Sequence, residues 1–171
     1  MDPIKKHLSD LPKKAAKAKK ENIAFFKRLK KLKPKKLDEV LHQEHEEVFE
    51  NTDCTQCANC CKTTGPLFTE RDVERLAKHF KMRPAQFVTK YLHKDDDYDW
   101  VLNSLPCPFL AADNYCSVYS VRPKACKEYP HTDRKNQREI LSLTQENSAA
   151  CPAVFEMVER MKKNLELASK S

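Results

Sequence analysis

Four of the eight cysteines in this chain fall within one short run, Cys54-Thr-Gln-Cys57-Ala-Asn-Cys60-Cys61. In a C-x2-C spacing the two thiolates lie about one turn apart and can reach one metal ion, and a further x2-C adds a third ligand. The side chains of the neighbours Cys60 and Cys61 diverge, so the two seldom serve the same tetrahedral ion. One of them is therefore expected to face a second metal or the edge of a cluster.

The second half of the chain supplies four more candidate ligands, Cys107, Cys116, Cys126 and Cys151. Eight thiols are enough for two four-cysteine zinc sites or for more than one iron site, and counting equally permits one site with spare thiols. Ligation by cysteine alone suits zinc and iron–sulfur clusters alike. The ferredoxin-like triple spacing tilts the choice slightly towards an iron–sulfur cluster.

The residues around the later cysteines form a distinctive pattern. Cys107 opens a C-P-F-L segment, Cys116 and Cys126 frame C-x2-Y-x2-R-P-x2-C, and a Tyr-Pro pair follows. Together with the first run, this pattern resembles the zinc- or iron-chelating CxxCxxCC domain family of YkgJ-type cysteine-cluster proteins, over roughly residues 50–155. The resemblance implies that the cluster cysteines are Cys54, Cys57, Cys60, Cys61, Cys107, Cys116 and Cys126, with Cys151 carried over less directly.

The chain departs from the family in the first run. Members often have a glycine there, where this chain has Ala58-Asn59. Asparagine tolerates the left-handed backbone conformation better than most residues, so the turn is expected to survive. Tyr119 and Arg122 match positions of the motif that are not obvious metal ligands.

Three classes of function fit these residues. The first is a metal-binding module, acting in redox or electron transfer. The second is an enzyme, because the motif is similar to that of flagellin lysine N-methylases, for which an iron–sulfur cluster and a methyl donor are expected. The third is a nucleic-acid or ribosome-associated protein with a structural metal domain. The single glycine, Gly65, excludes phosphate-binding loops that need two or three glycines, and with them P-loop and standard Rossmann enzymes.

Other groups that could bind metal have simpler interpretations. His42 and His45 do not match the zinc-protease motif and sit among acids on a solvated helix face. His131 is expected at the surface or behind the ligands. The acidic run 95–99 lacks the glycine and the final acid of a calcium loop.

Charge is concentrated at the N-terminus. The 171 residues carry a net charge of +7, but residues 1–36 hold 14 basic and three acidic residues, a balance of +11, which leaves −4 for residues 37–171. A basic amphipathic helix in residues 1–36 could bind an anionic partner, either nucleic acid or a membrane surface. The favoured alternative is a solvated helix whose apolar stripe docks on the domain.

The chain shows no apolar segment of a signal peptide and no membrane span, so it is expected in the cytoplasm. Thiols are kept reduced there, which favours metal binding over disulfides. The predicted fold is mainly α: a basic helical extension, residues 1–49, followed by a small helical metal-binding domain, residues 50–171. The apolar stripes that predict its helices are Ile23/Phe26/Leu29/Leu32 beside Phe25, Leu37/Val40/Leu41/Val48, Val73/Leu76/Ala77/Phe80, Phe87/Val88/Tyr91/Leu92 and Phe155/Val158/Met161/Leu165. Prolines are expected at the starts of helices, at Pro12, Pro34, Pro84, Pro123 and Pro152. Thr69 with Asp72 resembles a capping box.

Overall fold

The computed structural model describes the backbone of residues 3–169 and the side chains of residues 8–166. The start of the first predicted domain and the end of the second therefore lie partly outside the described residues. The fold is mainly helical, as predicted, with a single two-stranded sheet among the described residues. The chain forms two compact units: unit 1 comprises Met1–Cys57 and Pro130–Ser171, and unit 2 comprises Ala58–Tyr129. The domain boundary expected between residues 49 and 50 stays a prediction.

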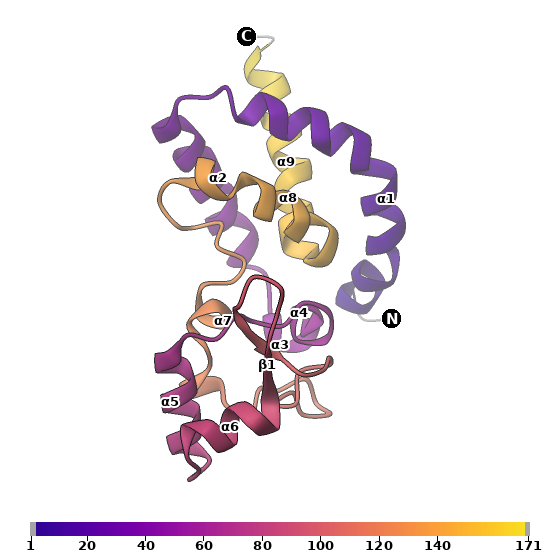
Figure 1. Cartoon of the computed structure of the whole chain (residues 1–171). Helices are drawn as coiled ribbons and strands as arrows, with labels where there is room; N and C mark the ends of the chain where they lie inside the picture. Colours follow the sequence, from indigo (N-terminus) through magenta and orange to yellow (C-terminus); the bar gives the residue numbers. More distant parts are fainter. Residues whose placement is uncertain (1–2, 170–171) are drawn as a thin grey trace. The chain divides into compact units, whose positions relative to one another are not determined.

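Unit 1 joins the two ends of the chain into one helical bundle (Figure 1). The long helix α1 curves around α8 and α9, and α2 packs against α9. Its elements are α1 (Pro3–Leu29), α2 (Pro34–Phe49), α3 (Cys54–Cys57), the 3-10 turn η2 (Gln137–Ile140), α8 (Leu141–Ala150) and α9 (Pro152–Ser169).

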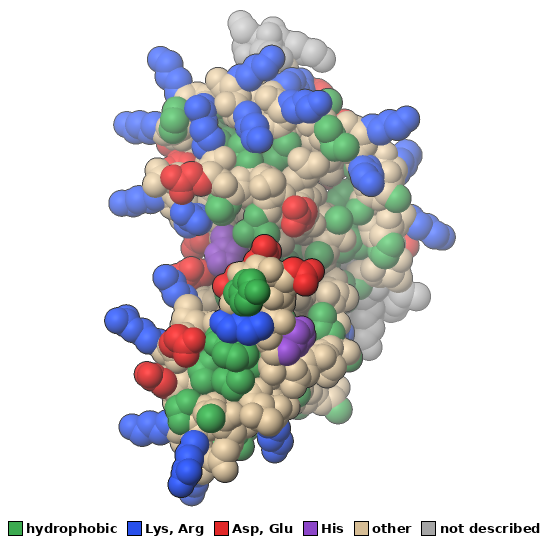
Figure 2. Space-filling model, viewed as in Figure 1, with side chains coloured by type: hydrophobic (Ala, Val, Ile, Leu, Met, Phe, Trp, Pro, Cys, Tyr) green, Lys and Arg blue, Asp and Glu red, His purple; other side chains and the backbone are tan. Residues whose placement is uncertain are grey.

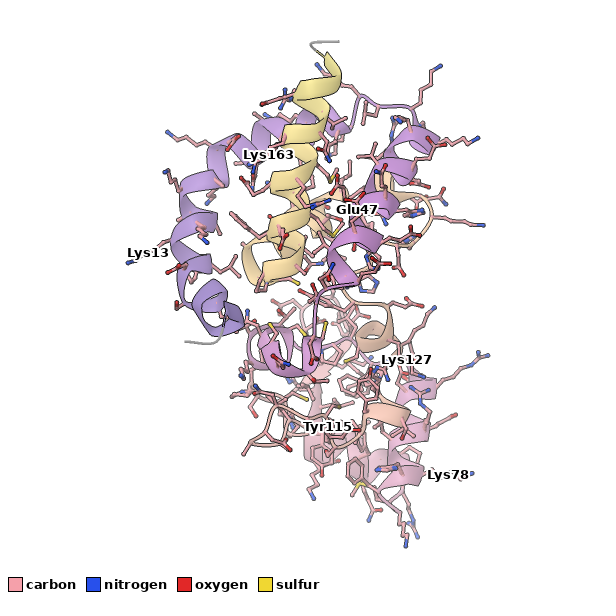
Figure 3. All side chains as sticks on the ribbon, turned by 180° about the vertical axis from the view of Figure 1, so that it is seen from behind. Lys13, Glu47, Lys78, Tyr115, Lys127 and Lys163 are labelled. Atoms are coloured by element: carbon pink, nitrogen blue, oxygen red, sulfur yellow. The ribbon has the colours of Figure 1, made fainter. Side chains whose placement is uncertain are left out.

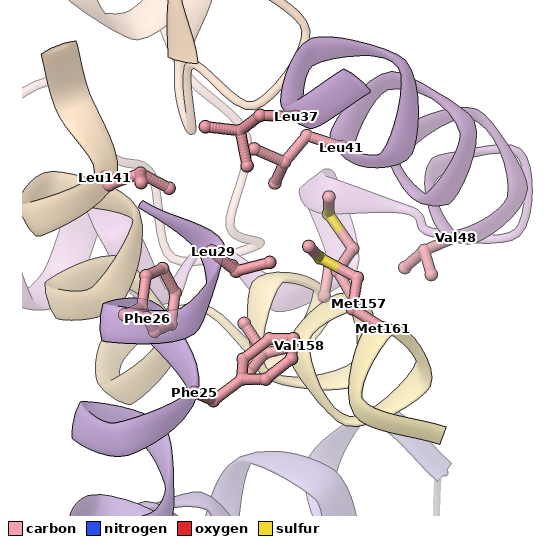
Figure 4. Close-up of a cluster of buried hydrophobic side chains, with 11 residues drawn as sticks. Phe25, Phe26, Leu29, Leu37, Leu41, Val48, Leu141, Met157, Val158 and Met161 are labelled. Carbon is pink, nitrogen blue, oxygen red and sulfur yellow. The ribbon is translucent and has the colours of Figure 1, made fainter. Parts of the chain in front are cut away.

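The core of unit 1 consists of apolar side chains from four helices (Figure 4). The apolar face of α1 is buried here, which confirms that this helix docks on the rest of the unit. One member of the predicted stripe is wrong, because Ile23 is 37% exposed. A stripe that steps by threes drifts around a helix of 3.6 residues per turn, so Ala18, Asn22 and Phe25 face inward instead. The core residues are Phe25, Phe26, Leu29, Leu37, Leu41, Val48, Leu141, Ala153, Met157, Val158 and Met161.

Proline marks the start of several helices. α2 begins at Pro34 and α9 at Pro152, as predicted, because proline at the first helical position has the required φ and its missing N–H would have no partner there. Pro12 does not start a helix, contrary to expectation. It lies inside α1, which already begins at Pro3.

Unit 2 places short helices around a small antiparallel hairpin. Leu92 was predicted to belong to a helix, but α6 ends at Tyr91, and Leu92 opens β1 and pairs with Leu102. The elements are α4 (Asn59–Thr63), α5 (Glu70–His79), α6 (Pro84–Tyr91), β1 (Leu92–Lys94), β2 (Trp100–Leu102), the 3-10 turn η1 (Tyr119–Val121) and α7 (Lys124–Glu128).

Aromatic side chains dominate the core of unit 2. Phe80 and Phe87 stack with ring centroids 6.2 Å apart, and Phe109 stacks on Phe80 at 5.5 Å. The predicted capping box at the start of α5 is confirmed, since Thr69 and Asp72 exchange hydrogen bonds. No helix in the described part of the chain has the length and apolar character needed to cross a membrane.

Candidate metal centre

The first cysteine run folds as two short helices, α3 and α4, joined at Ala58. The carboxylate of Asp53 accepts hydrogen bonds from the backbone N–H and the hydroxyl of Thr55, which fixes the start of α3. Ala58 adopts the left-handed conformation, with φ 49° and ψ 18°. The expectation that Asn59 would take this role is wrong. Alanine in this conformation costs about 1–2 kcal/mol, which explains why a glycine is usual in this run.

Backbone hydrogen bonds bring three segments with cysteines together in unit 2. The N–H of Cys107 donates to the carbonyl of Cys61 at 2.8 Å, which ties the second segment to α4. Cys116 pairs across a bridge with Leu110, and the N–H of Leu110 donates to Cys107 at 3.0 Å. These bonds hold the backbones of the three cysteines in place, although Cys61 and Cys116 are 55 positions apart in the sequence.

A further thiol of unit 2, Cys126, lies in α7. This helix begins at Lys124, directly after Pro123, as the sequence predicts. The buried carboxylate of Asp72 anchors its start, since it accepts a hydrogen bond from the backbone N–H of Lys124 at 3.1 Å. Arg75 pairs with Asp72 at 2.5 Å and also donates to the carbonyls of Val121 and Arg122, so helix α5 holds the segment that leads to Cys126.

Burial and the negative charges of neighbouring thiolates raise the pKa of most thiols in unit 2. Burial raises the pKa of Cys107 to about 11 and that of Cys126 to about 12, and the charges of the other cysteines in this unit add to the shift. Burial also raises the pKa of Cys116. The charges of Cys61, Cys107, Cys116 and Cys126 thus influence one another, and we call these four cysteines the unit 2 thiol set.

Arg122 has a role that sequence reasoning did not assign. Its guanidinium stacks on the ring of Tyr119 at 3.8 Å and donates to the Tyr119 carbonyl. Its positive charge lowers the pKa of both Cys116 and Cys126, against the larger effect of burial. The R-P spacing in the motif was the available signal, and only the fold shows that the charge of Arg122 acts on these thiols.

The adjacent pair has one acidic thiol. A hydrogen bond from Cys60 lowers the pKa of Cys61 to about 7, burial opposes this shift, and the charge of Lys62 supports it. Cys61 is therefore the thiol of its set that is most easily ionised at neutral pH. The expectation that Cys60 and Cys61 serve different metals stays a prediction.

The remaining cysteines belong to unit 1. Cys54 and Cys57 are the ends of α3, and Cys151 separates α8 from α9. Burial raises the pKa of Cys151 to about 11, and the charges of Cys57 and Cys54 contribute. We call these three the unit 1 thiol set.

Neither thiol set has the geometry of a complete metal site. In the part of the chain that the structure describes, no three Cys, His, Asp or Glu side chains converge closely enough to hold one metal ion. None of the eight thiols described forms a disulfide. The donors nevertheless fit zinc or an iron–sulfur cluster, because both take thiolates. Binding would have to draw the thiols together, which couples metal affinity to folding.

His42 and His45 were expected on a solvated face of α2, but both also contact other residues of the chain. His42 lies 2.8 Å from the carbonyl of Arg134, and His45 lies 2.7 Å from the hydroxyl of Thr132. Both residues therefore hold the segment that follows Pro130, about 90 positions further along the chain. Contacts at this separation leave no trace in a local sequence pattern.

The acidic run forms the turn between β1 and β2. There the carboxylate of Asp95 accepts hydrogen bonds from the backbone N–H groups of Asp97 and Asp99.

Short helices and turns that hold the partly buried thiols of the unit 2 set define a small helical cysteine-cluster protein of the metal-binding class. Residues 53–152 match the family model CxxCxxCC, whose description is "Putative zinc- or iron-chelating domain". The match covers more than half of the chain, and the protein belongs to this family. Searches of the curated proteins and of the solved structures give no match.

Proposed function

We propose that this protein binds zinc or an iron–sulfur cluster through its cysteines, with the unit 2 thiol set as the principal ligands. The observation that supports this function is that backbone hydrogen bonds hold the segments of Cys61, Cys107 and Cys116 to one another, while Asp72 anchors the helix that carries Cys126. A fold that ties together separate segments, each with a cysteine, has little reason to do so for packing. Cys54, Cys57, Cys60 and Cys151 are the proposed further ligands.

The function then depends on the metal. Zinc has no redox chemistry and would stabilise the fold, whereas an iron–sulfur cluster would supply one-electron transfer. All thiols of the unit 2 set are only partly buried, which leaves such a cluster within reach of a redox partner. We therefore propose electron transfer as the function if the metal is iron.

Elemental analysis of protein purified without oxygen tests the proposal. We expect stoichiometric zinc, or iron with acid-labile sulfide and a visible absorption band. Cys61→Ser and Cys126→Ser should each lower the metal content. Tyr115→Phe, beside Cys116 in the chain and visible in Figure 3, should leave it unchanged. Metal-free protein, or full metal content in both serine variants, would contradict the proposal.

A second function, association with an anionic partner, is supported by a different observation. Most exposed lysines of α1 have no acidic partner among the described residues, and α1 lies in unit 1, whose core does not depend on the unit 2 thiol set. In this function the metal domain would be structural.

A further inference from the structure

One face of α1 carries a row of exposed lysines. Lys13, Lys17, Lys20 and Lys27 are exposed and follow one another at intervals of four, three and seven residues. At 3.6 residues per turn these positions fall within about 80° of arc, and they span about 21 Å along the helix. We call these four residues the α1 lysine face. Figure 3 shows Lys13 pointing away from α9, and Figure 2 shows basic side chains standing out from the surface around α1.

The charges of this face are not neutralised within the chain. In the described part of the chain, none of the four lysines forms an ion pair. The two acids of the helix, Asp10 and Glu21, flank one edge of the face. Glu21 pairs with Lys162 at 3.1 Å and not with a lysine of the face. Four uncompensated cations in a row attract a polyanion and release its bound counterions.

The opposite face of α1 is not available to a membrane. A helix that lies in a membrane interface inserts its apolar face between the lipids. Here Phe25, Phe26 and Leu29 are at most 3% exposed, because they pack in the core of unit 1. Among the described side chains of α1, Ile23 is the one large apolar residue at the surface.

The shape of α1 also favours a partner other than a bilayer. The helix bends around α8 and α9, so its outer side is convex (Figure 1). A flat membrane would meet only part of a convex row of charges at one time. A nucleic acid chain is flexible enough to follow such a row and to place its phosphates against the lysines.

We infer that the α1 lysine face binds the phosphate backbone of a nucleic acid. This inference deepens the second proposed function, an anionic partner for α1, and it requires no metal. Recognition by phosphate contacts alone carries no sequence information, so the binding is expected to be non-specific and sensitive to salt.

The test compares two variants of the full-length protein with equal changes in charge. In the first, Lys13, Lys17, Lys20 and Lys27 are replaced by glutamine. In the matched control, four exposed lysines elsewhere are replaced by glutamine: Lys78, Lys81, Lys135 and Lys163. Circular dichroism and metal analysis establish that both variants keep their fold and metal. Binding is measured by fluorescence anisotropy with single-stranded RNA, with duplex DNA and with anionic phospholipid vesicles over a range of salt concentrations.

We expect the first variant to lose most of its affinity for nucleic acid at low salt. Affinity falls as salt rises, and this fall should become less steep. The magnitude of the slope of log affinity against log salt should drop by about 3 for single strands and about 4 for a duplex, since each phosphate contact contributes about 0.7–0.9. The control should keep its slope within about one unit of the unmodified protein.

Equal weakening in both variants would overturn the inference. So would binding to vesicles, through the same lysines, that is stronger than binding to either nucleic acid; in that case an anionic partner would remain as a function. Absence of binding to all three probes would overturn both. Metal content is measured separately, so none of these results bears on the proposed metal site.

Discussion

At the level of single residues, the thiols of the unit 2 set differ in how readily they ionise. Cys61 has a pKa of about 7 because Cys60 donates a hydrogen bond to it, whereas burial raises the pKa of Cys107 to about 11 and that of Cys126 to about 12. A thiol must lose its proton before it can bind a metal. Metal uptake at neutral pH would therefore release protons from Cys107 and Cys126.

This difference predicts how metal affinity depends on pH. Between pH 7 and 9 the thiols of Cys107, Cys116 and Cys126 are protonated in the metal-free protein, because their pKa values are raised. For a site formed by the unit 2 thiol set, the log of apparent metal affinity should then rise with a slope of about 3 per pH unit, one for each proton displaced. Cys61 should add to the slope only below about pH 7. Competition with a coloured chelator at several pH values measures the slope.

The variant Cys126→Ser should lower this slope by about one, and Tyr115→Phe should not change it. A flat dependence on pH would show that these thiols are not the ligands, or that they are already ionised without metal.

At the level of elements, helix α5 positions the helix that carries Cys126. Burial raises the pKa of Asp72, but hydrogen bonds from Thr69, Arg75 and Lys124 outweigh this effect, so the net pKa is lowered. The same carboxylate thus closes the capping box of α5 and holds the first backbone N–H of α7. A residue outside the cysteine motif therefore decides where a proposed ligand lies.

Replacing Asp72 by alanine should destabilise the protein by about 2 kcal/mol. Loss of one partner from a fully buried pair costs about 3–5 kcal/mol, and we reduce this value because Arg75 is 34% exposed to solvent. The variant should also retain less metal. Urea unfolding measures the free energy, with Asp96→Ala at an exposed position as the control, for which a change within about 0.5 kcal/mol is expected.

The contribution of Asp72 has a defined direction with pH. Because its folded pKa is lowered, its stabilisation is complete above the ordinary carboxyl pKa of 3.8 and disappears as the pH falls through the lowered value. The difference between the unmodified protein and Asp72→Ala should therefore shrink in strong acid. A constant difference down to pH 2 would contradict this account.

At the level of the whole molecule, the two units differ in what holds them together. Unit 1 has an apolar core from four helices and an ion network in which Arg160 pairs with Glu44 at 2.7 Å and also with Glu47. Unit 2 has an aromatic core, but its segments 58–65 and 107–128 are short helices and turns around the thiols. These segments gain most from a bound metal.

Removing the metal should therefore affect the units unequally. After treatment with a chelator, backbone amides in residues 58–65 and 107–128 should exchange with solvent much faster, because local opening no longer costs the free energy of metal binding. Amides of α2 and α9 should keep most of their protection. Hydrogen exchange measured by mass spectrometry resolves these segments. Equal loss of protection in both units would show that the metal holds the entire chain together.

Local signals in the sequence were sufficient for most helices and for the candidate ligands. Pro34, Pro84 and Pro152 fix the first residues of three helices, since proline restricts its own backbone wherever it stands. The spacing of the cysteines and of the R-P segment identified the family. Helix α8 was not predicted, because its buried residues are largely polar and show no apolar period.

Contacts between distant residues were decided by the tertiary structure alone. The sequence determined that eight thiols are present and that basic charge gathers at the N-terminus. Only the fold decided that Cys61 lies with Cys107, Cys116 and Cys126, that Ala58 takes the left-handed turn, and that the apolar face of α1 is buried. The physical reason is that spacing constrains neighbours within one or two turns, whereas the pairing of segments 50 or more residues apart depends on how their buried surfaces fit together.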